Sequence, residues 1–416
     1  MDTSQQPTSG SAPRDPTPVE RVHAEKVVIV VLNWNRREET LACLESLEKA
    51  DLAGAAVMVV DNGSHDGSVE AIQTRFPWVR VLPLGENRGF AGGNNAGIRV
   101  ALEEGAEAVL LLNNDTVVFP DFLHPLLWTA NGEPKAAGVS SVALRMDRPD
   151  LIDAAYLTIY WGHGIVWHHG VNRMPGEGFD RSCVIDAGIG CSFLMRADAL
   201  REVGLLDESY FAYHEEVDWC FRARQAGYEI YYQPLSALWH HGSKSTDTRR
   251  PPKPEYPLFR DTRPKLPNPV PLSWSPIRCY LGARNSVRFI RAHATWSQKW
   301  IFVRSTLYCV PLEFLAAVTG REEEYDIGAW NYARFLAFYV LDRRGILAPP
   351  PAELCAEMRE HPRWLLYVPG DLLWSLPRDV WRAYRMGCLT QVIETVRGLW
   401  DGILDRPLPL KRLGLR

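Results

Sequence analysis

The chain has 416 residues, 46% of them hydrophobic and 23% charged, which is ordinary for a globular protein with room for two or three domains. Its net charge of -4 gives no reason to expect a nucleic-acid partner. The eight cysteines show no CxxC pair and no zinc-type spacing, so we expect reduced thiols. No apolar run approaches the ~18 residues of a membrane span, and the N-terminus lacks the apolar region of a signal peptide. These features predict a cytoplasmic protein.

Residues 1–25 are rich in Ser, Thr, Gln and Pro, which predicts a disordered tail. From residue 26 onward the pattern alternates between strands and helices. Apolar runs predict strands at 27–32, 56–60, 79–82 and 109–112. Helical spacing predicts helices at 38–50, at 68–75 and in a segment that ends near residue 104. Repeated β-α-β units of this kind favour a parallel sheet with right-handed crossovers.

The strand expected at 109–112 runs directly into Asn113, Asn114 and Asp115. Ligands of an open parallel sheet bind just beyond the carboxyl ends of its strands. One carboxylate flanked by amides suits a diphosphate bound through magnesium or manganese, because these ions favour oxygen ligands. An Asx-type turn is the alternative here, because Asn and Asp are common turn residues.

Other predicted strands also end in polar residues or glycine, at Asn33, at Asp61 and before the glycine-rich segment 87–97. Asp61 is well placed to bind ribose hydroxyls or a base, although a turn is the simpler interpretation of its motif alone. We interpret 87–97 as a loop that leads into a helix and lets the backbone approach a phosphate. Its glycines do not fit GxGxxG. We expect all these strand ends and Asp115 to converge on one edge of the sheet.

The middle of the chain carries a second group of chemically active side chains. Residues 186–195 predict a loop entering a strand, and Glu215, Glu216 and Asp218 belong to a later predicted helix. Ion pairing on a surface face is one interpretation of these acids. A carboxylate-rich setting that adjusts the pKa of a general base is the other. His240 ends a further strand and would complete a metal site if it lay near Asp115, although a lone histidine is more often structural.

Six motifs, in this order, resemble those of family 2 glycosyltransferases with the GT-A fold. They are Asn33-Trp34-Asn35, residues 61–68, residues 87–91, Asn113-Asn114-Asp115, Glu215-Glu216-Val217-Asp218 and Trp239-His240. The pattern is most similar to the bacterial rhamnosyltransferase-like branch that builds surface polysaccharides. The resemblance implies an α/β, Rossmann-like GT-A domain at 26–246, with a mostly parallel central sheet flanked by helices. It is specific for fold and reaction class and weakly specific for the sugar.

The resemblance assigns the donor side to the strand ends. Asp61 would bind the base or ribose, and Asn33 and Arg36 would line the same pocket. Arg88 would face the diphosphate. The other residues expected on the donor side are Asn62, Gly89, Asn94, Asn113 and Asn114.

The resemblance also implies a metal and a base. Asp115 would coordinate a magnesium or manganese ion, with His240 as a further ligand. Glu216 would be the general base that deprotonates the acceptor hydroxyl, supported by Glu215 and Asp218. The residues expected on the acceptor side are Gly190, Asp207 and Trp219.

Two positions depart from the family pattern. Asn113 stands where the first Asp of the DxD motif is expected, which removes one negative charge and could weaken metal affinity. Glu215-Glu216 replaces the common Glu-Asp or Asp-Asp, which changes the length of the side chain but keeps the carboxylate. Residues 167–170 repeat the Trp-His-His-Gly of 239–242, and we assign this repeat to an acceptor-side insertion.

The C-terminal part differs in composition from the rest. Eight prolines lie between 251 and 271, which predicts a stiff linker at 247–272. Residues 273–416 predict a helical, aromatic- and arginine-rich extension, with Arg284, Arg288 and Arg291 on one helical face. Two interpretations stay open: a helical bundle with these arginines on its solvated face, or a surface that meets anionic membrane.

The function predicted from these features is inverting transfer of a sugar from a nucleotide-diphosphate donor, with dTDP-rhamnose or a UDP-sugar favoured. The acceptor would be a hydroxyl group of a lipid-linked molecule, an oligosaccharide or a polysaccharide in cell-surface glycan synthesis. Peripheral contact with the cytoplasmic face of the membrane is compatible with such an acceptor. The alternatives are a non-catalytic nucleotide-sugar-binding scaffold and a nucleotidyltransferase, although residues 33–40 lack a glycine- and lysine-rich phosphate loop.

Overall fold

The computed structural model describes residues 21–162, 164–242, 275–319 and 390–415. Contacts divide this part of the chain into two compact units, the first containing 21–159 and 166–242, the second 275–319 and 390–414. The predicted tail, the linker and the aromatic segments between 320 and 389 lie outside the described residues, and the predicted domain boundaries stay predictions. Among the described residues, no helix is both long and apolar enough to cross a membrane.

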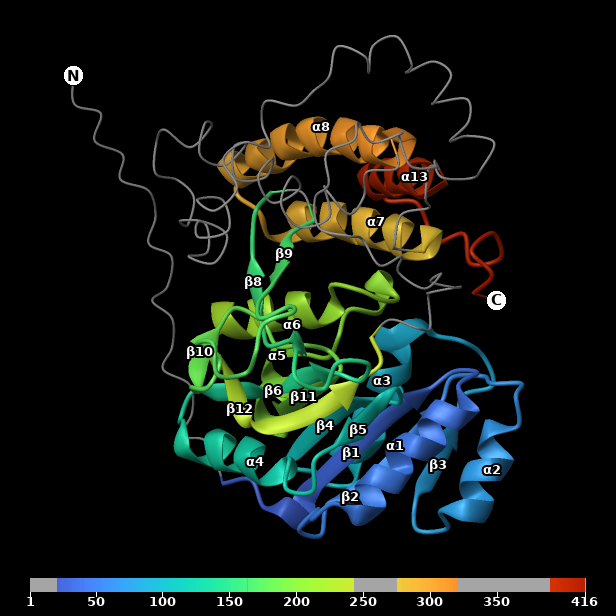
Figure 1. The fold of residues 1–416 in the computed structure, drawn as a ribbon, viewed down its shortest axis with the longest axis vertical. Helices are drawn as coiled ribbons and strands as arrows, with labels where there is room; N and C mark the ends of the chain where they lie inside the picture. Colours follow the sequence, from blue (N-terminus) through green and yellow to red (C-terminus); the bar gives the residue numbers. More distant parts are fainter. Residues whose placement is uncertain (1–20, 163, 243–274, 320–389, 416) are drawn as a thin grey trace, which may run out of the picture. The chain divides into compact units, whose positions relative to one another are not determined.

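The first unit is built on a ten-stranded mixed sheet in the order β10-β12-β6-β11-β4-β1-β2-β3, with β5 beside β12 and β7 beside β6 (Figure 1). A separate hairpin pairs β8 with β9. The strands are β1 (Val27–Asn33), β2 (Ala56–Asp61), β3 (Arg80–Pro83), β4 (Ala108–Asn113), β5 (Thr116–Val118), β6 (Ala136–Arg145), β7 (Ile152–Ala154), β8 (Leu157–Ile159), β9 (Val166–His168), β10 (Cys183–Ile185), β11 (Ser192–Arg196) and β12 (Glu229–His240).

The helices of the first unit follow the strands that they connect. They are α1 (Arg37–Lys49), α2 (Ser68–Arg75), α3 (Gly89–Glu103), α4 (Leu123–Gly132), α5 (Ala197–Val203) and α6 (Glu215–Gln225), with short 3-10 turns η1 (Ala24–Lys26) and η2 (Glu208–Tyr210). The second unit contains α7 (Pro276–His293), α8 (Trp296–Thr319) and α13 (Thr390–Ile403).

The α/β class and the predicted early elements are confirmed. β3, β2, β1 and β4 are parallel neighbours. The apolar runs of β1, β2 and β4 are largely buried, as expected for a parallel sheet covered by helices, whereas β3 at the edge of the sheet is partly exposed. Beyond β4 the sheet is mixed rather than mostly parallel, since β11 runs antiparallel to both β4 and β6. The position of β11 between β4 and β6 brings the middle of the sequence beside the first strands.

We expected the glycine-rich segment 87–97 to be a loop. Most of it is helical instead, because α3 begins at Gly89. Its glycines let the helix pack closely on the sheet. A methyl group at Gly97 would lie 2.7 Å from Cγ1 of Val30 and 2.9 Å from Cγ2 of Val60. Both valines are fully buried, and β-branched side chains have little freedom to move.

We expect Gly97→Ala to lower the free energy of unfolding by about 1–3 kcal/mol, because overpacking a well-packed core forces side chains and backbone apart. The matched control is Gly132→Ala at the end of α4, where an added methyl group meets nothing within 4 Å. Urea unfolding of both variants measures the difference. Equal stability of the two variants would contradict the close packing of α3.

The arginine row of α7 (Arg284, Arg288 and Arg291) contacts the C-terminal end of α13. Arg291 Nη1 donates to the carbonyl oxygens of Gly402 and Ile403 at 3.1 and 3.0 Å. Arg284, which is 3% exposed, donates to the carbonyl oxygen of Arg406 at 3.3 Å, and Arg288 pairs with Asp405. Cations at a helix C-terminus bind carbonyls that have no partner within the helix. The row is therefore not a purely solvated face, because Arg284 is buried, although Arg291 stays exposed.

Candidate active site

The ends of β1, β2 and β4 meet in a network of polar side chains, as predicted. Asn33 Nδ2 donates to Asp61 Oδ1 at 2.8 Å and to Ser64 Oγ at 3.0 Å. Thr40 of α1 donates to Asn33 Oδ1 at 2.8 Å, and Asn114 Nδ2 donates to Thr40 Oγ1 at 2.8 Å. The parallel register places Asn33 opposite Asp61. Asp61 is 3% exposed, so its carboxylate is held in one orientation at this edge of the sheet.

Other residues predicted on the donor side shape the start of α3. Asn62 Oδ1 accepts from the backbone N–H of Arg88 at 2.9 Å, and its Nδ2 donates to the carbonyl oxygen of Gly89 at 3.1 Å. Asn94 donates to the carbonyl oxygen of Phe90 at 3.0 Å. Asn62 and Asn94 are buried and form these bonds within the protein, so we assign them to the support of α3 rather than to ligand contact. The half-exposed Arg88 precedes a helix N-terminus, where the dipole favours anions.

Arg36 and Asn113 lie at the rim of this network. Arg36 immediately precedes α1, and its guanidinium lies 3.3 Å from Glu39. Asn113 ends β4, and its carbonyl oxygen accepts from Thr116 Oγ1 at 2.7 Å. Both side chains are partly exposed.

Asp115 and His240 are brought together by strand pairing. Asp115 lies in the turn between β4 and β5, and β5 pairs antiparallel with the end of β12, so that Thr116 stands opposite His240. His240 Nε2 lies 3.3 Å from Asp115 Oδ1. Its Nδ1 lies 2.8 Å from Oδ2 of Asp153, a residue of β7 that we did not single out from the sequence. Both groups of the predicted metal pair are about one-tenth exposed.

The pair fits a divalent cation that also binds phosphate oxygens. His240 Nε2 is buried and forms no well-aligned hydrogen bond among the described residues, although Asp115 Oδ1 lies 3.3 Å away. Burial alone would raise the pKa of Asp115, but the charge of His240 holds that pKa below its ordinary value. The described part of the chain has no group of three or more acidic, histidine or cysteine ligands. Magnesium typically keeps one or two protein ligands and completes its shell with substrate phosphates and water, which agrees with a two-residue site.

Glu215 and Glu216 begin α6, where Glu215 is buried and Glu216 is partly exposed. Oε2 of each carboxyl group has no hydrogen-bond partner among the described residues. Burial raises the pKa of Glu216 to about 7. Burial and the neighbouring charge of Glu216 raise the pKa of Glu215 well above its ordinary value. A carboxylate with a pKa near neutrality and no internal partner is suited to accept a proton from a bound hydroxyl.

The chain next to these glutamates is held in an unusual backbone conformation. Phe211, Tyr213 and His214 have φ values of 67°, 70° and 76°, in the left-handed region that side chains other than glycine rarely adopt. The carbonyl oxygen of Phe211 accepts from the backbone N–H of Ala91 at 3.1 Å. Gly89 packs directly against Phe211, so a side chain at this position would collide with it. The start of α3 therefore supports the turn that presents α6.

Gly190 and Cys191 connect the two halves of the site. A methyl group at Gly190 would lie 3.7 Å from Cδ of Glu216, so this glycine borders the predicted base. The next residue, Cys191, accepts a hydrogen bond from the backbone N–H of Asn113 at 3.0 Å. Burial raises the pKa of its thiol to about 12, and His240 is close enough to influence it. Gly190 therefore lies next to the predicted base Glu216, and Cys191 lies near the predicted metal pair of Asp115 and His240.

Three other predicted site residues have structural roles. Trp219 is fully buried, and its Nε1 donates to the carbonyl oxygen of Gly204 at 2.8 Å, so it does not reach an acceptor. Asp207 caps η2 by accepting from the backbone N–H of Ser209 at 2.9 Å. Asp218 accepts from Arg222 Nε at 2.8 Å one helical turn away, which is the ion pair that we considered for this helix.

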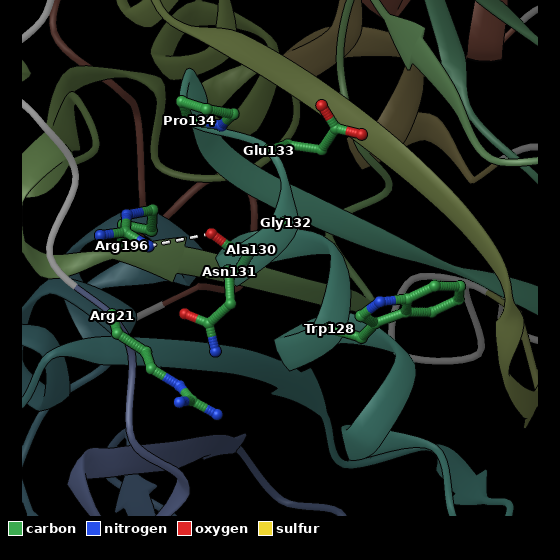
Figure 2. A pocket seen from close by; sticks show the side chains of 8 residues that line it. All are labelled: Arg21, Trp128, Ala130, Asn131, Gly132, Glu133, Pro134 and Arg196. Atoms are coloured by element: carbon green, nitrogen blue, oxygen red, sulfur yellow. Dashed lines mark hydrogen bonds between the residues drawn. The ribbon is translucent and has the colours of Figure 1, made fainter.

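Two further features lie apart from the predicted residues. His169, in the repeated Trp-His-His-Gly, stacks on Tyr156 and lies 2.8 Å from Thr158 Oγ1. Burial lowers its pKa to about 4. Figure 2 shows a pocket of about 410 Å³ beside α4, where Arg196 donates to the carbonyl oxygen of Ala130 at 3.0 Å. None of the predicted site residues lines this pocket.

Comparisons with known proteins agree with this geometry. Residues 28–204 match the model of glycosyl transferase family 2. The N-acetylglucosaminyl-diphospho-decaprenol L-rhamnosyltransferase of Mycobacterium tuberculosis is 30% identical over 223 residues, which cover 49% of this chain and 72% of that protein. The dTDP-rhamnosyl transferase RfbF of Shigella flexneri is 26% identical over 222 residues, covering 53% of this chain and 70% of that protein.

Among solved structures, a mannosyltransferase from Pyrobaculum calidifontis in complex with GDP-Man and Mn²⁺ aligns with a TM-score of 0.46 at 15% identity. The alignment covers 95% of this chain and 91% of that one. The family assignment rests on the sequence matches. The family model covers the strand-end network and Asp115 and ends at residue 204, before Glu215 and Glu216. The chain belongs to glycosyl transferase family 2.

Proposed function

We propose that this glycosyltransferase moves a sugar from a nucleotide-diphosphate donor to a hydroxyl of a lipid-linked glycan acceptor, with inversion at the anomeric carbon. The observation that carries the proposal is Glu216, a partly buried side chain whose Oε2 has no hydrogen-bond partner among the described residues. It borders Gly190, and the next residue, Cys191, lies close enough to His240 of the metal pair to be influenced by it. The two relatives named for rhamnosyl transfer support dTDP-rhamnose as the donor. The relative named for a decaprenol-linked substrate supports a lipid-linked acceptor.

The reaction needs a base on one face of the sugar and a stabilised diphosphate on the other. Glu216 accepts the proton of the acceptor hydroxyl while the acceptor oxygen forms a bond to the anomeric carbon. The bond from that carbon to the diphosphate oxygen breaks, and its electron pair leaves with the nucleoside diphosphate. Asp61 binds the nucleoside, with Asn33 holding its carboxylate in place, and Arg88 at the start of α3 faces the negative charge that develops on the leaving group.

Asp115 and His240 would hold a magnesium or manganese ion, which would neutralise the diphosphate as it leaves. The missing carboxylate at Asn113 leaves this pair as the proposed protein ligands. The ring of His240 is oriented by Asp153, because a histidine ligand usually donates its second ring N–H to a carboxylate.

A thermal-shift screen of dTDP-rhamnose, UDP-sugars and GDP-sugars, each with and without manganese, tests the donor and the metal together. A ligand that binds only the native state at 100 times its Kd stabilises it by about 2.7 kcal/mol. We expect the largest shift with dTDP-rhamnose and manganese, followed by rhamnosyl transfer to a polyprenyl-diphosphate-linked sugar. No shift with any nucleotide sugar would contradict the proposal and favour a scaffold that does not use these donors.

A further inference from the structure

Helix α13 of the second unit is packed with its polar side inward. It lies against α7, where Gly398 and Gly402 allow close approach to Tyr280 and Arg284 (Figure 1). Glu394 is only 7% exposed, and Thr395 only 6%. The opposite face is apolar and exposed, with exposed fractions between 38% and 56% at Ile393, Val396, Trp400, Ile403 and Leu404. A helix at the surface of a water-soluble bundle normally shows the reverse arrangement.

Helix α8 also has an exposed apolar face, although its buried side includes the apolar Phe302. Its exposed apolar residues follow spacings of four, three and four, which place them on one helical face. Phe302 and Ser305 are buried on another side of the helix. The exposed residues are Trp296 (88%), Trp300 (65%), Val303 (46%) and Leu307 (73%). We call these residues, together with the five of α13, the apolar faces of α8 and α13. An exposed apolar surface of this extent marks an interaction site.

The charges around these faces are strongly biased. Over residues 296–310 the charged residues of α8 are Lys299 and Arg304, and both are basic. Arg397 is exposed on α13, whereas Glu394 of that helix is buried and pairs with Arg397 and Arg412. Lys299 Nζ lies 5.8 Å from the centre of the Trp296 ring, and Arg304 lies on the same helix. The surface therefore combines exposed tryptophan and branched aliphatic side chains with positive charge, and it complements a partner that is apolar and anionic.

We propose that the apolar faces of α8 and α13 insert into the interfacial region of an anionic lipid bilayer. Tryptophan is favoured at the level of the headgroups, and basic residues near the surface are attracted to anionic lipid. Helices that lie in the plane of the membrane do not have to cross it, and none of the described helices is long and apolar enough to do so. The inference rests on the proposed function only for the identity of the bilayer, which would be the one that carries the lipid-linked acceptor.

Flotation of the full chain with vesicles tests this inference without donor or acceptor. We expect binding to phosphatidylcholine vesicles that contain phosphatidylglycerol, weaker binding to phosphatidylcholine alone, and a loss of binding at high salt. The double variant Trp300→Ser/Trp400→Ser should bind at least about tenfold more weakly, because each exposed side chain loses its apolar contact with the lipid. The matched control is Trp128→Ser, which removes a 68% exposed tryptophan from α4 of the first unit and should bind like the native protein.

A second variant keeps the test decisive if the tryptophan changes disturb folding. Lys299→Glu/Arg304→Glu alters two charges beside α8 and should weaken binding to anionic vesicles only. Native-like flotation of both double variants would overturn the proposal. So would the absence of vesicle binding by the native protein.

Other occupants of the apolar faces would give different results. If the native protein forms a dimer that Trp300→Ser/Trp400→Ser dissociates, a second copy covers the faces. If the native protein neither dimerises nor binds vesicles and the variants have a lowered Tm, residues 320–389 of the same chain cover the apolar faces. Failure of the nucleotide screen would leave all these readouts intact.

Discussion

Glu216→Gln should lower kcat by about 10²–10⁴-fold, because it removes the group that accepts the proton of the attacking hydroxyl. The change keeps the size of the side chain, so the stabilisation by nucleotide sugar should stay at the native level. Single-turnover transfer and thermal shift with the donor separate these two effects. The matched control is Glu215→Gln in the same turn of α6. Burial and the charge of Glu216 raise the pKa of Glu215 well above its ordinary value and so favour its neutral form, and its neutral replacement should cost less activity than Glu216→Gln.

The pH profile follows from the same carboxyl group. The base must be ionised, and burial raises the pKa of Glu216 to about 7. The kcat/KM of the native enzyme should therefore fall as the pH drops below about 7, by roughly tenfold per unit, and level off above it. This acidic limb should be absent from the residual activity of Glu216→Gln. If the variant keeps both the native rate and the native limb, another group is the base.

Asp115→Asn should abolish the part of donor stabilisation that depends on manganese, because it removes the carboxylate of the two-residue pair. Asp153→Asn should weaken manganese affinity by about 10–100-fold, the usual effect of losing the carboxylate that orients a histidine ligand. Manganese titration by electron paramagnetic resonance in the presence of dTDP measures both effects without turnover. Excess manganese should restore much of the activity of Asp153→Asn and little of that of Asp115→Asn.

Asp150→Asn is the matched control for Asp153→Asn. Asp150 lies three residues earlier, pairs with Arg148 at 3.1 Å and is half-exposed, so it should not affect the metal. Equal manganese affinity of the Asp150 and Asp153 variants would show that the bond from His240 to Asp153 does not position the ligand. Manganese-independent donor binding by the native protein would argue against the metal pair itself.

The early strands and their polar ends were predictable because the signals are local. A run such as residues 109–112 is buried in any parallel sheet, and the residues that follow it must lie at the carboxyl edge of that sheet. The convergence of Asn33, Asp61 and Asn114 follows from this rule and from the parallel register, and the structure confirms it. Motif order was sufficient for the family, because six short motifs seldom coincide by chance.

Long-range pairing decided the rest of the site. His240 reaches Asp115 only because β5 pairs antiparallel with β12, and Asp153 reaches His240 from β7, a three-residue strand without a distinctive pattern. Local sequence also does not separate a polar group that faces a ligand from one that supports the fold. Asn62, Asp207 and Trp219 form their hydrogen bonds inside the protein, whereas Glu216 has none for Oε2 among the described residues. In α7, helical spacing grouped the arginines correctly, but their contact with the end of α13, more than a hundred residues away, depends on packing alone.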